Sequence, residues 1–242
     1  MTPRFHCPIP LAPGADVELS AEAAHHATKV LRMGQGDAIV LFDGRGGEWT
    51  GQLARVGKTV TVALEKFDAV DREPPIAITL VQGLAAADKM DWIVQKGVEM
   101  GVTAIQPVAA RRSVIRLSGE RMERRVAHWQ AVAIAACEQC RRNRVPHVAP
   151  LVDLPQFLAG AAAQNAMRLV LAPGAGQRLT DLPKPDRPVM FLVGPEGGFE
   201  QTELSTASLA GFSAISLGPR VLRTETAGMA ALAAMMALWG DF

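Results

Sequence analysis

The sequence predicts an α/β fold, with a small β-rich N-terminal domain followed by a larger domain built on a mostly parallel sheet. Residues 38–67 alternate apolar and polar side chains around two turn signals, "DGRGGE" and "RVGKT", as in a three-stranded antiparallel meander. From residue 76 onward, strand-like runs alternate with helical patterns, which is typical of a parallel sheet covered by helices on both faces. Between them, "DAVDREPPIAI" is charged and contains two prolines, as linkers do. We therefore expect domains over residues 1–72 and 73–242.

A short helix is expected ahead of the meander, in "LSAEAAHHATKVLRMG". Ser20 is a suitable N-cap, because its hydroxyl can accept a hydrogen bond from a free backbone amide of the first turn. Ala24, Ala27, Val30 and Leu31 recur at helical spacing and predict one buried face.

The second domain shows the alternation element by element. Apolar runs predict strands, and amphipathic or capped segments predict helices, with Thr224 as a possible cap of the last helix and Glu225 in its first turn. The expected strands cover residues 76–85, 104–110, 168–173, 188–194 and 214–218, and the expected helices cover residues 88–100, 119–140, 154–164, a segment after Glu200, and a segment from Thr224.

Composition places the 242-residue chain among globular proteins, with 49% apolar and 20% charged residues. No apolar run approaches the roughly 20 residues of a membrane span, and "MTPRFHCPIP" lacks a signal-peptide core, so we expect a soluble cytoplasmic protein with no membrane partner. Three cysteines do not indicate a disulfide framework. Cys137 and Cys140 lack a second pair of the kind that zinc sites use, so we expect no metal and interpret them as packing residues.

Positive charge is concentrated in one segment, although the formal net charge is only +1. Arginine's planar fork suits bidentate phosphate recognition, whereas a solvated helix face is the alternative interpretation. Between residues 111 and 147 there are three glutamates and nine arginines, namely Arg111, Arg112, Arg116, Arg121, Arg124, Arg125, Arg141, Arg142 and Arg144.

Three unusual loops follow predicted strands: "LAPGAGQ", "VGPEGGFE" and "LGPRVLRTETA". In a parallel sheet such loops gather at the carboxyl edge, where ligands bind. The glycines of "GPEGG" allow close approach to the backbone, but the Lys-Ser/Thr of a phosphate loop is missing. Because Glu196 would repel phosphate, a neutral or cationic ligand such as a sulfonium fits better. A tight strand-to-helix turn remains the alternative.

The last of these loops places Arg220 and Arg223 beside the start of a predicted helix. A helix N-terminus already favours anions, so two arginines there predict an electropositive site. An ordinary capped helix with surface arginines is the alternative.

Taken together, these motifs resemble one family. "KMDWIVQKGVEMGV", "EQCRRNRVP", "LVGPEGGF" with Glu203, and "LGPRVLRTETA" are similar, in this order along the chain, to motifs of the bacterial small-subunit ribosomal RNA (uracil-N3-)methyltransferases of the SPOUT class. The N-terminal stretch "HHATKVLRMGQGDAIVLFDGRGGEW" is similar to that family's PUA-like RNA-binding domain. The resemblance therefore spans nearly the whole chain.

The resemblance implies more than the composition could. It implies a deep trefoil knot in the C-terminal α/β domain, S-adenosylmethionine bound in the knot loops, and a homodimer packed through the knotted region. It also implies that N3 of a specific uridine in 16S ribosomal RNA is methylated, either in the free RNA or in the assembled small subunit. The apolar helix "AGMAALAAMMALW" fits a dimer interface or a buried core equally well.

Residue roles follow from the same resemblance. Loss of the uracil imide proton requires a base or a positive environment; we expect Arg220 and Arg223 to supply the latter, with Glu138 and Glu196 as weaker candidates for the base. RNA contacts are expected at Arg4, Arg32, Arg111, Arg112, Arg142 and Arg144. Cofactor contacts are expected at Leu171, Ala172, Pro173, Gly194, Pro195, Glu196, Gly197, Gly198, Leu217, Gly218 and Leu222.

Two alternatives remain open from the sequence. One is a SPOUT-class methyltransferase that acts on another ribosomal RNA or tRNA nucleotide. The other is a non-catalytic RNA-binding homologue that keeps the fold without the activity.

Overall fold

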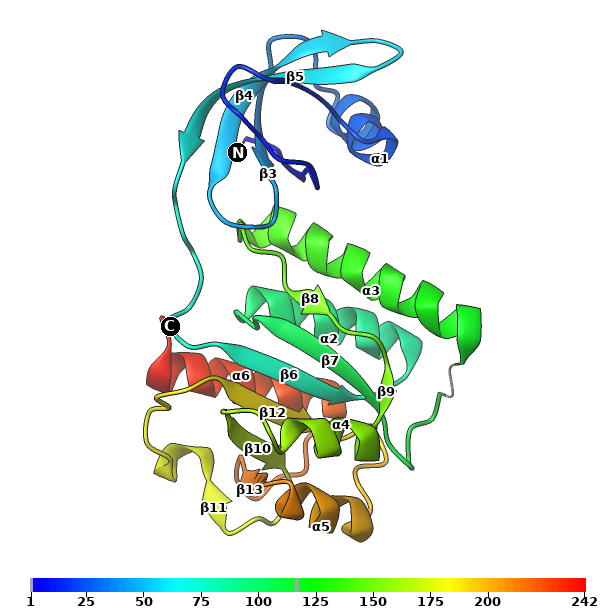
Figure 1. Cartoon of the computed structure of the whole chain (residues 1–242), viewed down its shortest axis with the longest axis vertical. Coiled ribbons are helices and arrows are strands. Elements are labelled where there is room, and N and C mark those ends of the chain that lie inside the picture. Colours follow the sequence, from blue (N-terminus) through cyan, green and yellow to red (C-terminus); the bar gives the residue numbers. More distant parts are fainter. Residues whose placement is uncertain (1, 116–117) are drawn as a thin grey trace. The chain divides into compact units, whose positions relative to one another are not determined.

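The computed structural model describes residues 2–115 and 118–242, and its contacts divide the chain into two units (Figure 1). The N-terminal unit comprises Met1–Glu73 together with Cys137–Val145, and the C-terminal unit comprises Pro74–Ala136 together with Pro146–Phe242. The segment Cys137–Val145 thus packs with residues that precede it by more than sixty positions. The linear sequence does not reveal this assignment.

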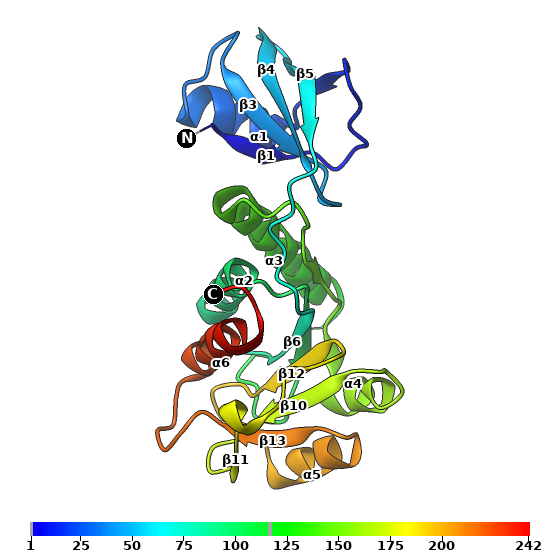
Figure 2. The ribbon, with the colours of Figure 1, turned by 90° about the vertical axis from the view of Figure 1, so that its left-hand side faces the viewer.

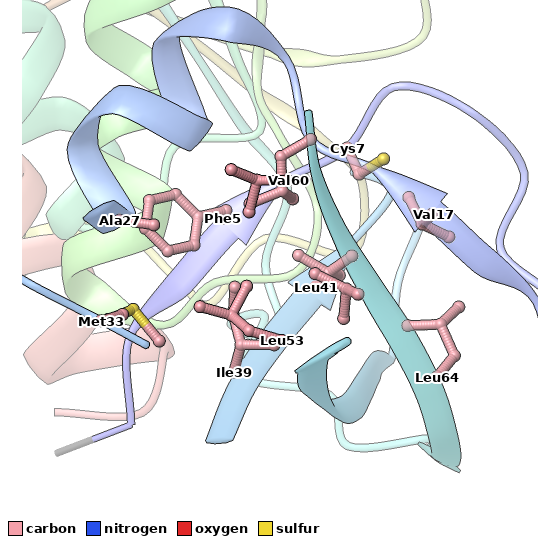
Figure 3. Packing of buried hydrophobic residues seen from close by; sticks show 12 residues of the cluster. Phe5, Cys7, Val17, Ala27, Met33, Ile39, Leu41, Leu53, Val60 and Leu64 are labelled. Atoms are coloured by element: carbon pink, nitrogen blue, oxygen red, sulfur yellow. The ribbon is translucent and has the colours of Figure 1, made fainter. Parts of the chain in front are cut away.

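A five-stranded sheet forms the N-terminal unit, in the order β1-β3-β4-β5-β2. The predicted meander is present as β3 (Ala38–Phe42), β4 (Glu48–Val56) and β5 (Val60–Asp68), whose pairs are antiparallel. The edge strands β1 (Arg4–His6) and β2 (Asp16–Glu18) were not predicted, because three residues are too few to show a period. One face of this sheet buries a cluster that includes Phe5, Leu41 and Leu53 (Figure 3).

The predicted N-terminal helix is present, but only part of its expected buried face is correct. Ser20 caps α1 (Ala21–His25), since its hydroxyl accepts a hydrogen bond from the amide of Ala23 at 3.1 Å. The chain then continues as a π-helical turn, η1 (His26–Val30), which has more residues per turn than an α-helix and so shifts the following side chains. Ala27 is buried, whereas Val30 and Leu31 are 59% and 44% exposed.

Parallel strands form the sheet of the C-terminal unit, in the order β11-β13-β10-β12-β6-β7-β8, with β9 also on β7. Every pair of described strands in it is parallel, as predicted. The two-residue strands β8, β9 and β11 were not predicted. The strands are β6 (Ile78–Gly83), β7 (Ala104–Ala109), β8 (His147–Val148), β9 (Val152–Asp153), β10 (Met167–Leu171), β11 (Gln177–Arg178), β12 (Val189–Val193) and β13 (Ser213–Ser216).

Helices cover both faces of this sheet (Figure 2). On one face α2 (Ala87–Glu99) packs against α6 (Thr224–Trp239), and on the other α4 (Leu154–Ala161) packs against α5 (Gln201–Leu209). The remaining helices are α3 (Gly119–Cys140) and the short η2 (Leu179–Asp181). Most apolar side chains of α6, including Leu232, Met235 and Met236, are buried within the chain, so core packing accounts for them.

Within residues 2–115 and 118–242, no helix is long and apolar enough to cross a bilayer.

Candidate functional site

A cavity of about 350 Å³ opens at the carboxyl ends of β10, β12 and β13. These strands are neighbours in the sheet, so the three loops that follow them meet at one edge. The cavity's lining includes every residue predicted to bind the cofactor, together with Arg220. Arg223 lies beside the lining as the exposed N-cap residue of α6. The tertiary fold therefore brings together three loops that are spread over fifty residues of sequence.

The wall formed by residues 194–198 is held at van der Waals distance from the end of β6. A Cβ atom on Gly83 would lie 2.6 Å from the backbone nitrogen of Pro195 and 3.0 Å from the carbonyl carbon of Gly194. The wall itself turns through a hydrogen bond from the Gly198 amide to the Pro195 carbonyl at 2.8 Å, with Gly198 at φ 66°. A side chain at position 83 would displace backbone atoms, whereas at position 198 the space is open and the positive φ favours glycine.

A buried polar hub lies behind this wall. The Thr224 hydroxyl donates to the Gly194 carbonyl at 2.5 Å and accepts from Gln82 Nε2 at 3.0 Å, while the same Nε2 also donates to the Gly83 carbonyl at 2.8 Å. The expectation that Thr224 caps α6 is therefore wrong. Arg223 is the N-cap residue, and Thr224, the first helical residue, uses its hydroxyl to hold the loop.

Glu196 serves as an anchor between the cavity wall and α2. Its Oε1 accepts a hydrogen bond from the Ala86 amide at 2.9 Å and lies 3.4 Å from Lys89 Nζ, which also lies 3.5 Å from Glu225. Burial alone would raise the pKa of Glu196, but the hydrogen bond from Ala86 and the charge of Lys89 outweigh it, so the pKa is lowered. An ionised, already bonded carboxylate is a poor proton acceptor.

The start of the basic segment lies against the same wall. Glu203 is buried and accepts from two amides, Arg111 N at 2.9 Å and Glu200 N at 2.8 Å, the second of which closes a capping box on α5. The guanidinium of Arg112 donates to the Gly197 carbonyl at 3.3 Å. The side chains of Arg111 and Arg112 are exposed beside the cavity, whereas Arg116 lies outside the described residues.

Arg4 and Arg142, two of the predicted RNA contacts, are buried in the N-terminal unit. Their side chains are 6% and 5% exposed, and they form ion pairs with Glu48 and Glu73 respectively. Burial disfavours ionised Glu48, but hydrogen bonds from Arg72, Arg4 and Asn143 dominate and lower its pKa to about 2. A guanidinium so enclosed cannot contact an RNA phosphate, and we correct the prediction for these two arginines to a structural role. Arg32 and Arg144 are exposed.

Glu138 also lies in the N-terminal unit, whereas the cavity belongs to the C-terminal unit. Its Oε1 accepts a hydrogen bond from the His6 amide at 2.9 Å, and burial raises its pKa although that hydrogen bond opposes the change. Nearby, burial raises the pKa of the Cys137 thiol to about 12, which fits its interpretation as a packing residue. Among the described residues, no group of side chains could hold a metal ion.

Gln82 and Lys89 support the site but were not identified from the sequence. Gln82 could have been noticed as a fully buried polar residue at the end of an apolar strand, "ITLVQG". Lys89 opens the motif "KMDWIVQKGVEMGV", but its role could not be inferred there, because its partners Glu196 and Glu225 lie more than a hundred residues away along the chain.

Comparisons with known proteins agree with this architecture. The family described as "RNA methyltransferase domain" matches residues 72–236, and that described as "RNA methyltransferase PUA domain" matches residues 19–64. The ribosomal RNA small subunit methyltransferase E of Buchnera aphidicola (Schizaphis graminum) is 31% identical over 241 residues, with 99% of this chain and 97% of that protein covered.

Two solved structures match over the full length of both chains. The ribosomal RNA small subunit methyltransferase E from Neisseria gonorrhoeae, bound to S-adenosyl methionine, has a TM-score of 0.95 at 42% identity. A protein from Legionella pneumophila in complex with the cofactor SAM has a TM-score of 0.95 at 38% identity. The chain belongs to the family of bacterial small-subunit ribosomal RNA methyltransferases that its motifs resemble.

Proposed function

We propose that this protein is an S-adenosylmethionine-dependent methyltransferase that modifies N3 of a specific uridine in 16S ribosomal RNA. The observation that carries the proposal is the cavity at the ends of β10, β12 and β13, which all the predicted cofactor residues line. The two similar structures described with the bound cofactor support it, since each covers the whole chain.

The residues present fit such a cofactor. The cavity is of the size that small-molecule sites have, and glycines and apolar residues make up most of its lining. When bound, S-adenosylmethionine supplies the electrophilic methyl group of its sulfonium. Gly194 to Gly198 form one wall and Leu217, Gly218 and Leu222 form another, while Leu171 to Pro173 lie between them, as β10 lies between β12 and β13.

The chain's contribution to catalysis is electrostatic. A uracil N3–H is a weak acid, and a nearby positive charge stabilises the anion left when the proton leaves. Arg220 lines the cavity and Arg223 is exposed next to it, so we assign them this role. Glu196 acts as an anchor for the wall. Glu138 is kept as the weaker candidate for the general base, and this role requires that the target uracil reach the N-terminal unit.

RNA binding is assigned to exposed arginines of both units: Arg32 and Arg144 in the N-terminal unit, and Arg111 and Arg112 in the C-terminal unit. Residues 1–72 would then serve as the PUA-like RNA-binding domain and residues 73–242 as the knotted SPOUT domain. A homodimer packed through the knot and a cytoplasmic location complete the proposal.

The test is a methyl-transfer assay with labelled S-adenosylmethionine on small ribosomal subunits and on naked 16S RNA. Because N3 methylation blocks Watson–Crick pairing, primer extension should stop at one uridine of the small-subunit RNA. Arg220→Ala should lower kcat strongly, whereas Arg220→Lys should restore part of it. Incorporation of the label into tRNA, or into another nucleotide of the ribosomal RNA, would refute the substrate assignment. If a calorimetric titration shows no binding of S-adenosylmethionine, the assignment as an enzyme is refuted.

A further inference from the structure

Two arginine-bearing loops of the N-terminal unit are joined edge to edge. The β3–β4 loop, residues 43–47, pairs with Asn143–Val145, which follows α3 (Figure 1). The Gly46 amide donates to the Asn143 carbonyl at 3.1 Å, and the Val145 amide donates to the Gly44 carbonyl at 3.1 Å. An arginine side chain reinforces the pairing, as Arg144 donates to the Arg45 carbonyl at 2.9 Å.

A network of buried polar and charged side chains holds this junction in place. Asn143 is 2% exposed; its side-chain oxygen accepts from Arg4 at 2.5 Å, and its Nδ2 donates to Glu48 at 3.0 Å. Arg72 donates both to Glu48 and to the Arg141 carbonyl, each at 3.0 Å. The junction is therefore rigid, because each buried polar contact would leave an unpaired group if the segment moved.

Three exposed arginines lie at the junction, with Asp43 and Asp71 beside two of them. Arg45, Arg141 and Arg144, which we call the three-arginine surface, are all exposed. The side chains of Arg45 and Arg144 are 65% and 56% exposed, and they are paired only at the surface, with Asp43 at 3.3 Å and Asp71 at 3.8 Å. Ion pairs of such exposed arginines contribute little to stability.

The backbone at Arg141 is strained in a way that points to a role for its side chain. Arg141 follows the last residue of α3 with φ 69°, a left-handed conformation that helices usually reserve for glycine. The other non-glycine residue with positive φ in residues 2–115 and 118–242 is Arg32, also an exposed arginine of this unit. Strain of this kind accumulates at functional positions.

We propose that Arg45, Arg141 and Arg144 form one binding surface for the phosphate backbone of the RNA substrate. The surface is composite, since residues 141–145 complete the N-terminal domain's RNA-binding face although they lie in the second domain by sequence. This inference rests on the proposed function. It adds two RNA-binding residues, Arg45 and Arg141, and places the RNA backbone at the junction between residues 43–47 and 143–145.

The first experiment compares charge-neutralising variants of the full-length protein. Binding to poly(U) and to small ribosomal subunits is measured by filter retention at salt concentrations from about 50 to about 300 mM. Over this range the slope of log K against log salt reports how many phosphates the protein neutralises. Arg45→Gln and Arg144→Gln should each lower the salt slope by about 0.7–0.9, which at physiological salt corresponds to roughly fivefold weaker binding. Arg45→Lys keeps the charge and should bind within about twofold of wild type.

Arg55→Gln is the matched control. Arg55 is an exposed arginine at the opposite end of β4. The Arg55→Gln variant therefore removes one positive charge from the same unit but leaves the three-arginine surface unchanged. Equal effects of the Arg45 and Arg55 variants would overturn the proposal, because binding would then depend on net charge alone. Unchanged binding in the Arg45 and Arg144 variants would also overturn it.

The second experiment separates function from folding at Arg141. Arg141→Gly relieves the backbone strain, so the melting temperature should rise by about 2 °C, while RNA binding weakens about fivefold. A variant that is more stable and binds RNA as well as wild type would show that the side chain has no such role.

The two proposals fail in different ways. If the wild-type protein transfers methyl groups to subunits but these variants bind normally, the proposed function stands and the composite surface falls. If wild-type protein binds neither RNA nor S-adenosylmethionine, the proposed function falls first.

Discussion

Gly83→Ala should weaken cofactor binding although Gly83 does not line the cavity. The new Cβ would lie 2.6 Å from the nitrogen and Cδ of Pro195 and 3.0 Å from the carbonyl carbon of Gly194. An ordinary contact for such atoms begins near 3.4 Å. The cavity wall would therefore have to move by about 0.8 Å, because its neighbours are backbone atoms that cannot rotate away.

The magnitude follows from overpacking. Forcing one methyl group into a filled site costs about 1–3 kcal/mol, so the free energy of unfolding should fall by that amount unless the wall yields. If the wall yields and the cofactor must return it to its wild-type position, the same energy is lost from binding. Affinity for S-adenosylmethionine should then fall by about 5–150-fold, since 1.4 kcal/mol corresponds to a factor of ten.

The assay is a calorimetric titration with S-adenosylmethionine, together with thermal unfolding with and without it. Gly97→Ala is the matched control, because its Cβ would meet Leu80 and Val102 at an ordinary 3.6 Å inside α2. That variant should bind normally and be more stable by about 0.5–1 kcal/mol, as alanine is in a helix interior. A Gly83→Ala variant with both wild-type stability and wild-type affinity would refute the assignment of residues 194–198 as a cofactor wall held against β6.

Three further outcomes are expected. Thr224→Val removes the hydroxyl that binds the Gly194 carbonyl, so the free energy of unfolding measured in urea should fall by about 1–3 kcal/mol. Thr224→Ser keeps the hydroxyl and should retain most of the wild-type stability. Glu48 has a folded pKa of about 2 against an ordinary 4.5, so its ionised form stabilises the fold above pH 4.5, and this contribution is lost as the pH falls toward 2. Glu48→Gln should therefore flatten the acid-induced fall in unfolding free energy by about 3 kcal/mol, and an unchanged acid profile would contradict the ion-pair assignment. Glu196→Gln can still accept the Ala86 amide, so methyl transfer should stay within about threefold of wild type; a loss of about a hundredfold would instead identify Glu196 as a general base.

The individual elements could be predicted because their signals are local. Helix 119–140 and the meander over residues 38–67 show their periods within a single window, and Ser20 caps the helix that follows it directly. The errors arose where a distant partner overrode the local pattern. Thr224 looks like a helix cap from its neighbours, but the carbonyl of Gly194 lies within reach of its hydroxyl in the folded chain.

The arginines show the same division. Composition marks the segment from residue 111 to 147 as basic, but it cannot tell an enclosed guanidinium from an exposed one. Arg142 is enclosed by Glu73, whereas Arg144, two residues later, faces solvent. Burial depends on which distant residue comes into contact, and no local window contains that information.

The sequence by itself determined the order of the longer strands and helices, the parallel sheet, the three loops that line the cavity and, through its motifs, the family. Those features depend on periodicity, glycine and proline placement, and short-range hydrogen bonding. Only the tertiary structure decided that residues 137–145 pack with the N-terminal unit, that Gly83 supports the cavity wall, and that Glu196 anchors α2. Each of these rests on contacts between residues separated by about seventy positions or more, which form only when the whole chain has folded.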